Sequence, residues 1–487
     1  MLTPLLISFI LYFCLVLAIS FVAYKVTANL SDYILGGRRL GGAVAALSAG
    51  ASDMSAWLLL GLPGAVYTFG LNQCWLPIGL IMGAYLNWLF IAKPLRVYTE
   101  VVNDSLTIPE FLANRFGPNY ASIMRLVSSA ALLIFFAFYS ASGLVGGALL
   151  LQKTFPSLDY MQALLLGSTI IVGYTFVGGF LAVSWTDFFQ GTFMFLCLLI
   201  VPFMATQGMH GVDETVKTLN LQDMNLLNPL HDVSLLLVVN LMAWGLGYFG
   251  QPHILVRFMA VSSTKEIPTA RRIGMSWMTL SLIGAMLTGL VGRAYFTEGL
   301  PNPESVFIHF SSVLFTPALS GVILAAILSS IMCALDSQLL ASASALTEDL
   351  YHPFIRKNAT QRELVWVGRV AVICIALIAL ALASDPNSKV LTLVGFAWAG
   401  LGSTFGPVII LSLFWKRLTG QGAVMGMLGG ASTVIVWKLL GSPVLYEIIP
   451  GFIVATLLAL VVSLAGKKPA PAIVHRHEEI IAKLRTL

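Results

Sequence analysis

Thirteen apolar runs, each long enough to cross a lipid bilayer, constrain this chain more than any other feature of its sequence. A membrane-spanning helix needs roughly 17–25 predominantly apolar residues. Only 10% of the 487 residues are charged, against about 25% in soluble proteins, which is too little charge to cover a soluble body of this size. The sequence therefore predicts an all-α polytopic membrane protein with about 13 transmembrane helices, approximately at 4–24, 43–70, 73–92, 123–151, 161–181, 186–206, 233–255, 273–297, 315–346, 364–384, 391–414, 420–440 and 446–465.

The positive charges of the loops test this count independently, because Lys and Arg stay on the cytoplasmic side of a membrane. Twenty-two of the 27 Lys and Arg fall in the odd-numbered loops or the C-terminal tail, and Arg257 is counted among the loop residues. This alternation predicts an N-terminus outside and a C-terminus in the cytoplasm, and one missed helix would scramble it. The other five lie on the opposite side: Lys153, Lys217, Arg293, Lys389 and Lys438.

A carboxylate interrupts the second apolar run, in LSAGASDMSAWLLLGLPG at residues 47–64. Asp53 is a candidate functional residue, since ionisable groups at membrane depth are costly and face cavities or partners. Small neighbours such as Gly50 and Ser55 would let the backbone unwind and offer carbonyl oxygens to a monovalent cation. Trp57 follows Asp53 by four residues, so both can face one cavity if the segment is helical.

The seventh run contains AWGLGYFGQPHI at residues 243–254, whose glycines and Pro252 disfavour a continuous helix. Trp244 and Tyr248 are four residues apart and bracket the weak point. Aromatic rings beside an unwound backbone suit a small zwitterion, because the rings take its apolar part and the helix ends take its charges. The alternative interpretation is an ordinary aromatic packing stripe.

The two interruptions fall in the second and seventh runs, which are five apart. Broken helices at matching positions mark the binding sites of transporters built from inverted repeats. Because five is odd, the second repeat would be inverted relative to the first. The predicted segments are a peripheral helix with a cytoplasmic loop (1–42), a five-helix repeat (43–206), an extracytoplasmic loop (207–232), the inverted repeat (233–415), two peripheral helices (416–466) and a cytoplasmic tail (467–487).

Seven stretches in order along the chain carry a family resemblance: DYILGGRRLGG, LSAGASDMSAWLLLGLPGAVY, VGGFLAVSWTDFFQG, MAWGLGYFGQPHILVRFMA, SALTEDLY, ELVWVGRV and LYEIIPGF. They resemble the proline-transporting bacterial members of the sodium/solute symporter family. The resemblance implies a leucine-transporter-like fold of two inverted five-helix repeats. It also implies alternating-access uptake of L-proline across the bacterial plasma membrane, with Na⁺ as the coupling ion. Other members carry other small organic solutes, but the match from Trp244 to Met259 favours proline.

The same resemblance implies roles for individual residues. Arg38 corresponds to a cytoplasmic-side arginine tied to sodium coupling, and Asp187 to an acidic residue near the inner ion pathway. Asp53 would serve sodium binding, together with backbone carbonyls of Ala51, Met54 and Ser330. The proline pocket would be lined by Ser55, Trp57, Tyr139, Trp244, Tyr248 and Pro252.

The ninth run, AAILSSIMCALDSQLL, departs from the family pattern. Relatives have two adjacent hydroxyls where this chain has Cys333 and Ala334, and neither side chain is a good ligand for a hard cation. Three arrangements are open. Asp336, Ser337 and Asp187 could form a displaced site that still includes Cys333. One aspartate could instead hold a proton, since two close carboxylates resist joint ionisation, and H⁺ would then drive transport. In the third, backbone carbonyls and water hold Na⁺, and Asp336 only forms hydrogen bonds.

Other functional classes fit the sequence less well. The seven histidines are scattered without a metal-ligand spacing such as HExxH, which argues against a membrane-embedded enzyme. The short tail has no room for the signalling domain of a sensor. Flux measurements distinguish a uniporter or channel from a coupled transporter. Asp53 and the two broken helices favour coupled transport.

The expected partners are L-proline, Na⁺ and the lipid bilayer. The net charge of +5 is spread over loops and does not indicate nucleic-acid binding, and no obligate protein partner is predicted. The HRHEE stretch in the tail, with His475 and His477, is interpreted as a solvated segment and not as a metal site.

Overall fold

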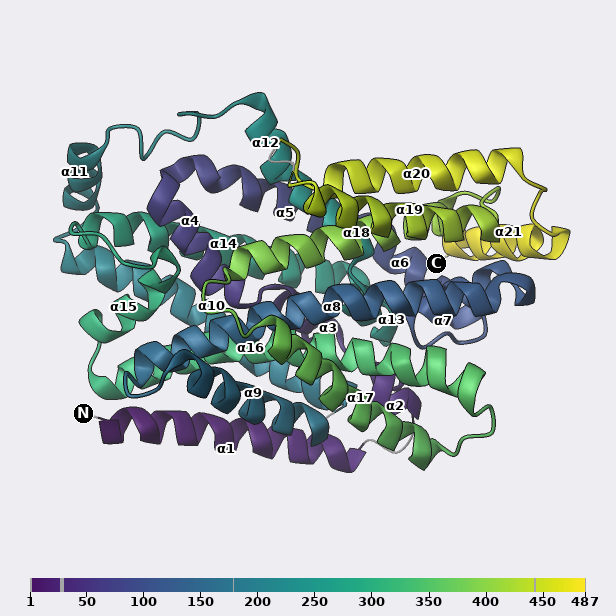
Figure 1. Ribbon diagram of the computed structural model, residues 1–487, viewed down its shortest axis with the longest axis horizontal. Helices are drawn as coiled ribbons and strands as arrows, with labels where there is room; N and C mark the ends of the chain where they lie inside the picture. Colours follow the sequence, from purple (N-terminus) through teal and green to yellow (C-terminus); the bar gives the residue numbers. More distant parts are fainter. Residues whose placement is uncertain (1, 27–29, 178, 442–443, 487) are drawn as a thin grey trace.

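The computed structural model describes residues 2–26, 30–177, 179–441 and 444–486, and these ranges form a bundle of helices. Most of the long helices run along the long axis of the molecule (Figure 1). The described residues form no strand, and Leu40 and Val261 make an isolated bridge. The predicted all-α fold is confirmed.

Every predicted apolar run falls on one helix or on consecutive helical segments. The long elements are α1 (Leu2–Val26), α3 (Gly42–Asp53), α4 (Leu62–Phe69), α5 (Trp75–Leu86), α6 (Ala92–Val101), α8 (Pro118–Thr154), α9 (Tyr160–Val177), α10 (Phe180–Gly208), α12 (Leu235–Met242), α13 (Pro252–Ala260), α14 (Ile267–Tyr295), α16 (Pro317–Ser344), α17 (Gln361–Leu382), α18 (Val390–Phe414), α19 (Gly420–Leu439) and α20 (Ile448–Ala465).

By length and apolar character, nine helical stretches in the described ranges could cross a membrane, or ten if the bent pair α12–α13 counts as one. One of them, Trp57–Val101, has 45 residues, too many for a single crossing. It is divided at Gly70, whose φ of 79° ends α4 before α5 begins. Shorter apolar stretches in α1 and α9, Ile7–Ile19 and Tyr160–Gly173, complete the thirteen runs.

Five further α-helices of the described ranges lie outside the apolar runs. They are α2 (Leu30–Leu35), α7 (Ile108–Phe116), α11 (Val212–Gln222), α15 (Val306–Leu314) and α21 (Pro471–Thr486). In Figure 1, α11 and α15 lie at the end where α1 begins, and α7 and α21 lie at the other end. The start of α1 and the C-terminal helix therefore occupy opposite ends of the molecule.

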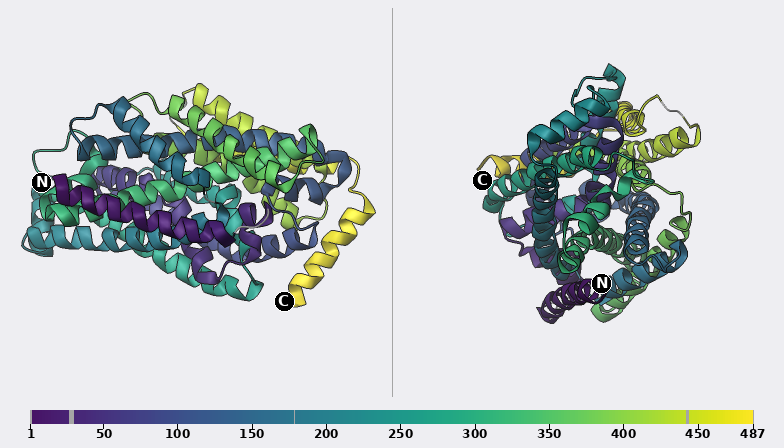
Figure 2. Two further views of the ribbon diagram at one scale, coloured as in Figure 1. Left: turned by 90° about the horizontal axis from the view of Figure 1, so that it is seen from below. Right: turned by 90° about the vertical axis from the view of Figure 1, so that its left-hand side faces the viewer.

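The interpretation of the tail as a solvated segment is wrong for the face of α21 that carries His477 and Ile480, whereas most of the helix is exposed. This helix crosses one end of the bundle, as the yellow ribbon in Figure 2 shows. The His477 side chain is only 3% exposed, and its Nδ1 lies 3.1 Å from the Tyr98 hydroxyl oxygen of α6. An ion pair of 2.7 Å joins Lys416 to Glu478. The sequence pattern did not reveal this docking because the partners of His477 lie hundreds of residues earlier.

Candidate functional site

The first broken helix lies where the Asp53 motif predicts it. Helix α3 ends at Asp53, and Met54 leaves the helical conformation with ψ of 68°. The chain resumes as a π-helical turn, η2 (Trp57–Gly61), which leads into α4. Backbone groups around Met54 are thereby released from the regular helical ladder, and such a break is tolerated only where protein or a cavity surrounds it.

The second broken helix joins α12 to α13 with a bend of 46°. Between them lies η5 (Ala243–Gly250), a 3₁₀ segment, followed by extended backbone at Gln251. Pro252 takes the first turn of α13, where its missing N–H costs no hydrogen bond. Both predicted interruptions are therefore present.

Three aromatic side chains from separate elements converge on Asp53. The Tyr248 hydroxyl of η5 donates a hydrogen bond to Asp53 Oδ2. The backbone carbonyl of Asp53 accepts from Trp57 Nε1 at 3.0 Å and from the Tyr139 hydroxyl of α8 at 3.3 Å. All four residues and the adjacent Ser55 are buried. The structure thus brings five of the predicted site residues together at the two helix breaks.

The space beside Asp53 is small in this conformation. A cavity of about 20 Å³ lies against Asp53, Asn87 and Tyr248, which is room for about one water molecule. Asn87 Nδ2 donates to the Tyr248 carbonyl at 2.9 Å and fixes η5 against the neighbouring helix. An organic ligand would enter this cluster only after the surrounding helices move apart.

Trp244 lies beyond the Asp53 cluster, on the far side of Trp398. The Tyr248 and Trp398 rings meet edge to face at 5.1 Å, and Trp398 Nε1 donates to the Trp244 carbonyl at 2.7 Å. The Trp244 ring stacks on Tyr446 at a centroid distance of 5.2 Å. Trp244, Trp398 and Tyr248 therefore follow one another as one aromatic wall, and of these three only Tyr248 hydrogen-bonds to Asp53.

Arg257 is buried inside α13, so its assignment to a loop was wrong. Its side chain is 1% exposed, and Nη2 lies 3.2 Å from Asp187 Oδ2 of α10. Nη2 also donates to Ser337 Oγ at 2.6 Å, and Nε donates to Ser48 Oγ at 3.1 Å. Ser52 Oγ lies 3.1 Å from the same Asp187 oxygen and 2.9 Å from Ser337 Oγ. A buried charge is tolerated here because an opposite charge and hydroxyl groups surround it.

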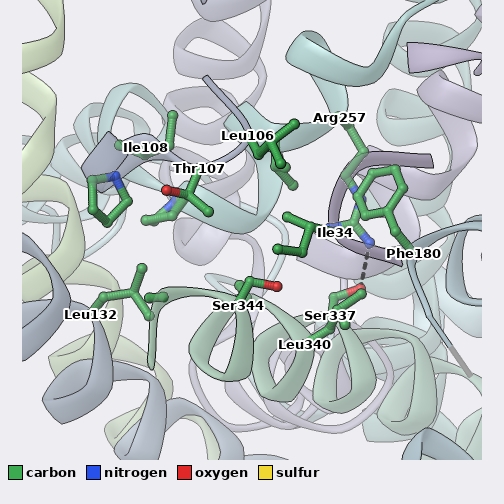
Figure 3. A pocket seen from close by; sticks show the side chains of 15 residues that line it. Ile34, Leu106, Thr107, Ile108, Leu132, Phe180, Arg257, Ser337, Leu340 and Ser344 are labelled. Atoms are coloured by element: carbon green, nitrogen blue, oxygen red, sulfur yellow. Dashed lines mark hydrogen bonds between the residues drawn. The ribbon is translucent and has the colours of Figure 1, made fainter. Parts of the chain in front are cut away.

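A second small cavity, of about 30 Å³, extends from Arg257 and Ser337 to Thr107. Figure 3 shows the Arg257 and Ser337 side chains joined by a hydrogen bond at one side of this cavity and Thr107 at the other. Pro252 lines this second cavity and does not line the cavity beside Asp53. At the far side, Thr107 Oγ1 donates to Asp349 Oδ2 at 2.7 Å.

Cys333 points from α16 toward α10. Its Sγ donates to Gln190 Oε1 at 3.0 Å, and Ser330 Oγ donates to the Ile327 carbonyl at 2.9 Å within its own helix. Asp336 is fully buried. The described ranges contain no group of three or more His, Cys, Asp or Glu side chains arranged to hold a metal ion.

Arg38 lies apart from both clusters, at the end of η1 (Gly36–Arg38). It pairs with Asp104 at 2.8 Å and donates to the carbonyls of Met259 at 2.7 Å and Ser105 at 2.9 Å. Burial lowers the pKa of this guanidinium, and the Asp104 carboxylate opposes that shift. Arg38 therefore ties the η1 loop to the end of α13, the helix that carries Arg257.

Several site residues were missed at the level of the sequence. Ser48 and Ser52 are four residues apart, so both lie on one face of α3, and both contact Asp187. This spacing could have indicated a polar face of the helix. Arg257 lies just beyond the end of the predicted seventh run, and nothing in the neighbouring sequence indicated that its side chain would be buried. The ring of His253 packs between Tyr139 and Phe136 at centroid distances of 5.7 and 5.5 Å, and no motif identified it.

Comparisons with known proteins agree with this architecture. The model of the sodium:solute symporter family matches residues 33–430. A high-affinity proline transporter of Bacillus subtilis is 50% identical over 461 residues, covering 94% of this chain and 97% of the relative. A sodium/proline symporter of Salmonella typhimurium is 48% identical over 481 residues, covering 97% and 95%. The solved structure of a Na⁺-coupled sialic acid symporter superposes with a TM-score of 0.82 at 18% identity, covering 96% of this chain and 99% of the other.

Proposed function

The chain belongs to the sodium:solute symporter family, and we propose that it is a secondary symporter that imports L-proline with the sodium gradient. The observation that carries this assignment is the identity of 48% over 97% of the chain to a sodium/proline symporter. The alignment covers 97% of the chain and 95% of the relative. The protein is a transporter, and no enzymatic role is needed to explain its buried polar groups.

Proline would bind where η5 faces Asp53. The aromatic rings of Tyr139 and Tyr248 would receive its hydrocarbon ring, and Trp57 would complete the wall. Trp244 would reach the ligand only after the helices move, because Trp398 lies between it and Tyr248. The interrupted backbone at Ser55 and the N-terminal turn of α13 at Pro252 would receive its charged groups, because free N–H and C=O groups and helix dipoles lie there. Pro252 reaches this space only in a conformation that joins the two small cavities.

Alternating access follows from the closed state of the site. The cavity of about 20 Å³ beside Asp53 is too small for proline, so loading and release require helix movements. We propose that the first repeat, 43–206, and the inverted second repeat, 233–415, move against each other, with their broken helices as hinges. The peripheral segments 1–42 and 416–466, the loop 207–232 and the tail 467–487 would lie outside the repeats.

The coupling ion would be Na⁺, with H⁺ as the alternative. The position between Asp187 and Ser337 holds the Arg257 guanidinium, which places a positive charge where the displaced cation site would lie. This arrangement favours a sodium site one helical turn away, at the level of Cys333, with carbonyls of Ala51, Met54 and Ser330. Asp336 and Asp53 would contribute negative potential, and Arg38 would couple ion release to the movement of α13.

The protein would reside in the bacterial plasma membrane with its N-terminus outside. The start of α1 and helix α21 lie at opposite ends of the bundle (Figure 1), as an odd number of crossings requires. The basic loops would then face the cytoplasm. An impermeant cysteine reagent applied from each side to single-cysteine variants in the loops would test this orientation.

Radiolabelled proline uptake into proteoliposomes, with a sodium or a proton gradient imposed alone, tests the function. Uptake against a concentration gradient is expected with inward Na⁺ and not with H⁺ alone. Equal uptake with the proton gradient alone would favour H⁺ coupling, and equilibration without accumulation would indicate a uniporter. Accumulation of another solute in place of proline would overturn the substrate assignment only.

A further inference from the structure

Gln190 connects the first helix of the chain to the helix that carries Cys333. It lies in α10 and is 2% exposed. Its Nε2 donates to the Tyr12 hydroxyl of α1 at 2.5 Å, and its Oε1 accepts from Cys333 Sγ at 3.0 Å. A buried carboxamide therefore spans three helices.

The contacts of Tyr12 orient this carboxamide. The Tyr12 hydroxyl accepts from Gln190 Nε2 and lies 3.8 Å from Met332 Sδ, to which it donates. Gln190 Oε1 is thereby directed at α16. Its partner there is a thiol, which is a weak hydrogen-bond donor, so the oxygen can be released to a stronger partner at little cost.

Next to Gln190, helix α10 packs closely against α3. Gly191 allows α10 to approach α3, because a Cβ placed on it would lie 3.1 Å from the Ala51 Cβ and 3.7 Å from the Leu47 carbonyl oxygen. Asp187 precedes Gln190 by three residues and lies on the same face of α10. Helices α3, α10 and α16 therefore meet at this level, one turn from the contact between Ser337 and Arg257.

We infer that Gln190 Oε1 is a side-chain ligand of the coupling cation, at the level of Cys333. The inference rests on the proposed sodium coupling and adds a ligand to it. Hard cations prefer oxygen ligands, and an amide oxygen supplies one without adding a charge to a region that already contains Asp187, Asp336 and Arg257. Cation binding replaces the thiol hydrogen bond, and Tyr12 is a positioning residue that keeps the oxygen turned inward.

Sodium titrations of proline uptake by purified variants in proteoliposomes test this ligand. Gln190→Leu is expected to raise the sodium concentration for half-maximal uptake about tenfold or more, with little change in the proline KM at saturating sodium. Tyr12→Phe is expected to raise it about 2- to 10-fold, since it removes one orienting hydrogen bond. Gln207→Leu is the matched control, because Gln207 lies in the same helix with an exposed side chain, and it should behave as the wild type.

A rescue experiment separates ligation from a structural role. Cys333→Ser places a hydroxyl oxygen beside the missing amide, so adding it to Gln190→Leu should recover at least half of the lost sodium affinity on a logarithmic scale. Cys333→Ser alone is the reference, because a hydroxyl at this position can also bind the cation when Gln190 is present. A gain in sodium affinity that is larger in Gln190→Leu than in the wild type indicates ligation, and an equal gain in both would overturn the inference. If Gln190→Leu does not fold, Gln190→Glu carries the test: it keeps an oxygen, and a sodium requirement increased about tenfold would overturn the inference.

The outcomes distinguish this inference from the proposed function. Wild-type uptake that needs no sodium would defeat the proposed coupling itself. Sodium-dependent wild-type uptake together with an unchanged sodium requirement in folded Gln190→Leu protein would defeat only the role of Gln190.

Discussion

Arg257 Nη2 lies 3.2 Å from Asp187 Oδ2, and both side chains are almost completely buried, at 1% and 0% exposure. The pair joins α13, which follows the second helix break, to α10. Only Gln251 separates η5 from α13, so we expect a movement of the aromatic wall to reach this ion pair. The pair therefore joins the helix that follows the proposed substrate cluster to the helix beside the proposed cation site.

Removing one charge of this pair should destabilise the protein more than removing both charges. Arg257→Gln leaves a buried carboxylate unpaired, which costs about 3–5 kcal/mol. The double variant Asp187→Asn with Arg257→Gln loses both charges and should recover part of the stability. Thermal unfolding of the purified variants in detergent is expected to rank wild type above the double variant and the double variant above Arg257→Gln. A double variant no more stable than the single one would contradict the pairing.

The hydrogen bond from Tyr248 to Asp53 should be required for transport. Asp53 Oδ1 has no hydrogen-bond partner among the described residues, so Tyr248→Phe removes the one donor found for this carboxylate. A hydrogen bond to a charged group is worth about 1.5–3 kcal/mol, which corresponds to a loss of about tenfold or more in transport efficiency. The kcat/KM for proline uptake measures it.

Tyr160→Phe is the matched control for Tyr248→Phe. The Tyr160 hydroxyl also donates to a buried acceptor, the Ala383 carbonyl at 2.7 Å, but it lies outside the Asp53 cluster. Its loss should leave proline uptake nearly unchanged. Equal losses in both variants would mean that the effect reflects packing and not the site.

The helices and their interruptions could be predicted from the sequence, and the pairings between them could not. Apolar length predicts each crossing, and glycines with Pro252 or a carboxylate such as Asp53 indicate where a helix breaks. These are local properties. The contact of Tyr248 with Asp53 joins residues 195 positions apart, and it depends on how the two broken helices pack.

Arg257 shows why charge alone was a poor guide to position. Near the end of an apolar run an arginine fits a cytoplasmic loop as well as it fits a buried pair. Only the packing of α13 against α3 and α10, which brings Ser48 and Asp187 to its guanidinium, decides between them. The docking of His477 was hidden for the same reason, because nothing in the tail itself identifies its partners.

The close contact between α5 and η5 should not tolerate a side chain at Gly83. A Cβ there would lie 2.1 Å from the Gly245 carbonyl oxygen, so Gly83→Ala must displace the second broken helix. Small residues at such contacts let helix backbones approach in a membrane, and overpacking costs about 1–3 kcal/mol. Lower thermal stability and reduced proline uptake are expected.

Gly173→Ala provides the comparison for Gly83→Ala. Its added Cβ would meet nothing within 4 Å, and alanine favours the helix by up to about 1 kcal/mol over glycine. Stability should stay equal or increase. A loss similar to that of Gly83→Ala would mean that the effect does not arise from contact with η5.

The docking of α21 should weaken as the pH falls. Burial, with a further contribution from Arg115, lowers the pKa of His477 to about 4, whereas a solvated histidine titrates near about 6.5. Between these values the released helix binds more protons than the docked helix, so protonation favours release. Docking is strongest above about pH 6.5 and is lost progressively toward about pH 4. Hydrogen–deuterium exchange of residues 471–486, corrected for the intrinsic pH dependence of exchange, measures the release.

Two variants decide whether His477 is the titrating group. His477→Gln keeps a neutral polar side chain at this position, so exchange in α21 should lose its dependence on pH between about 4 and 6.5. His475→Ala is the control, because His475 is exposed and pairs with Glu479 at 3.3 Å on the open face of the same helix. It should retain the wild-type profile. A wild-type profile in His477→Gln would assign the transition to another group, and a pH-independent wild type would mean that α21 stays docked whatever the charge on His477.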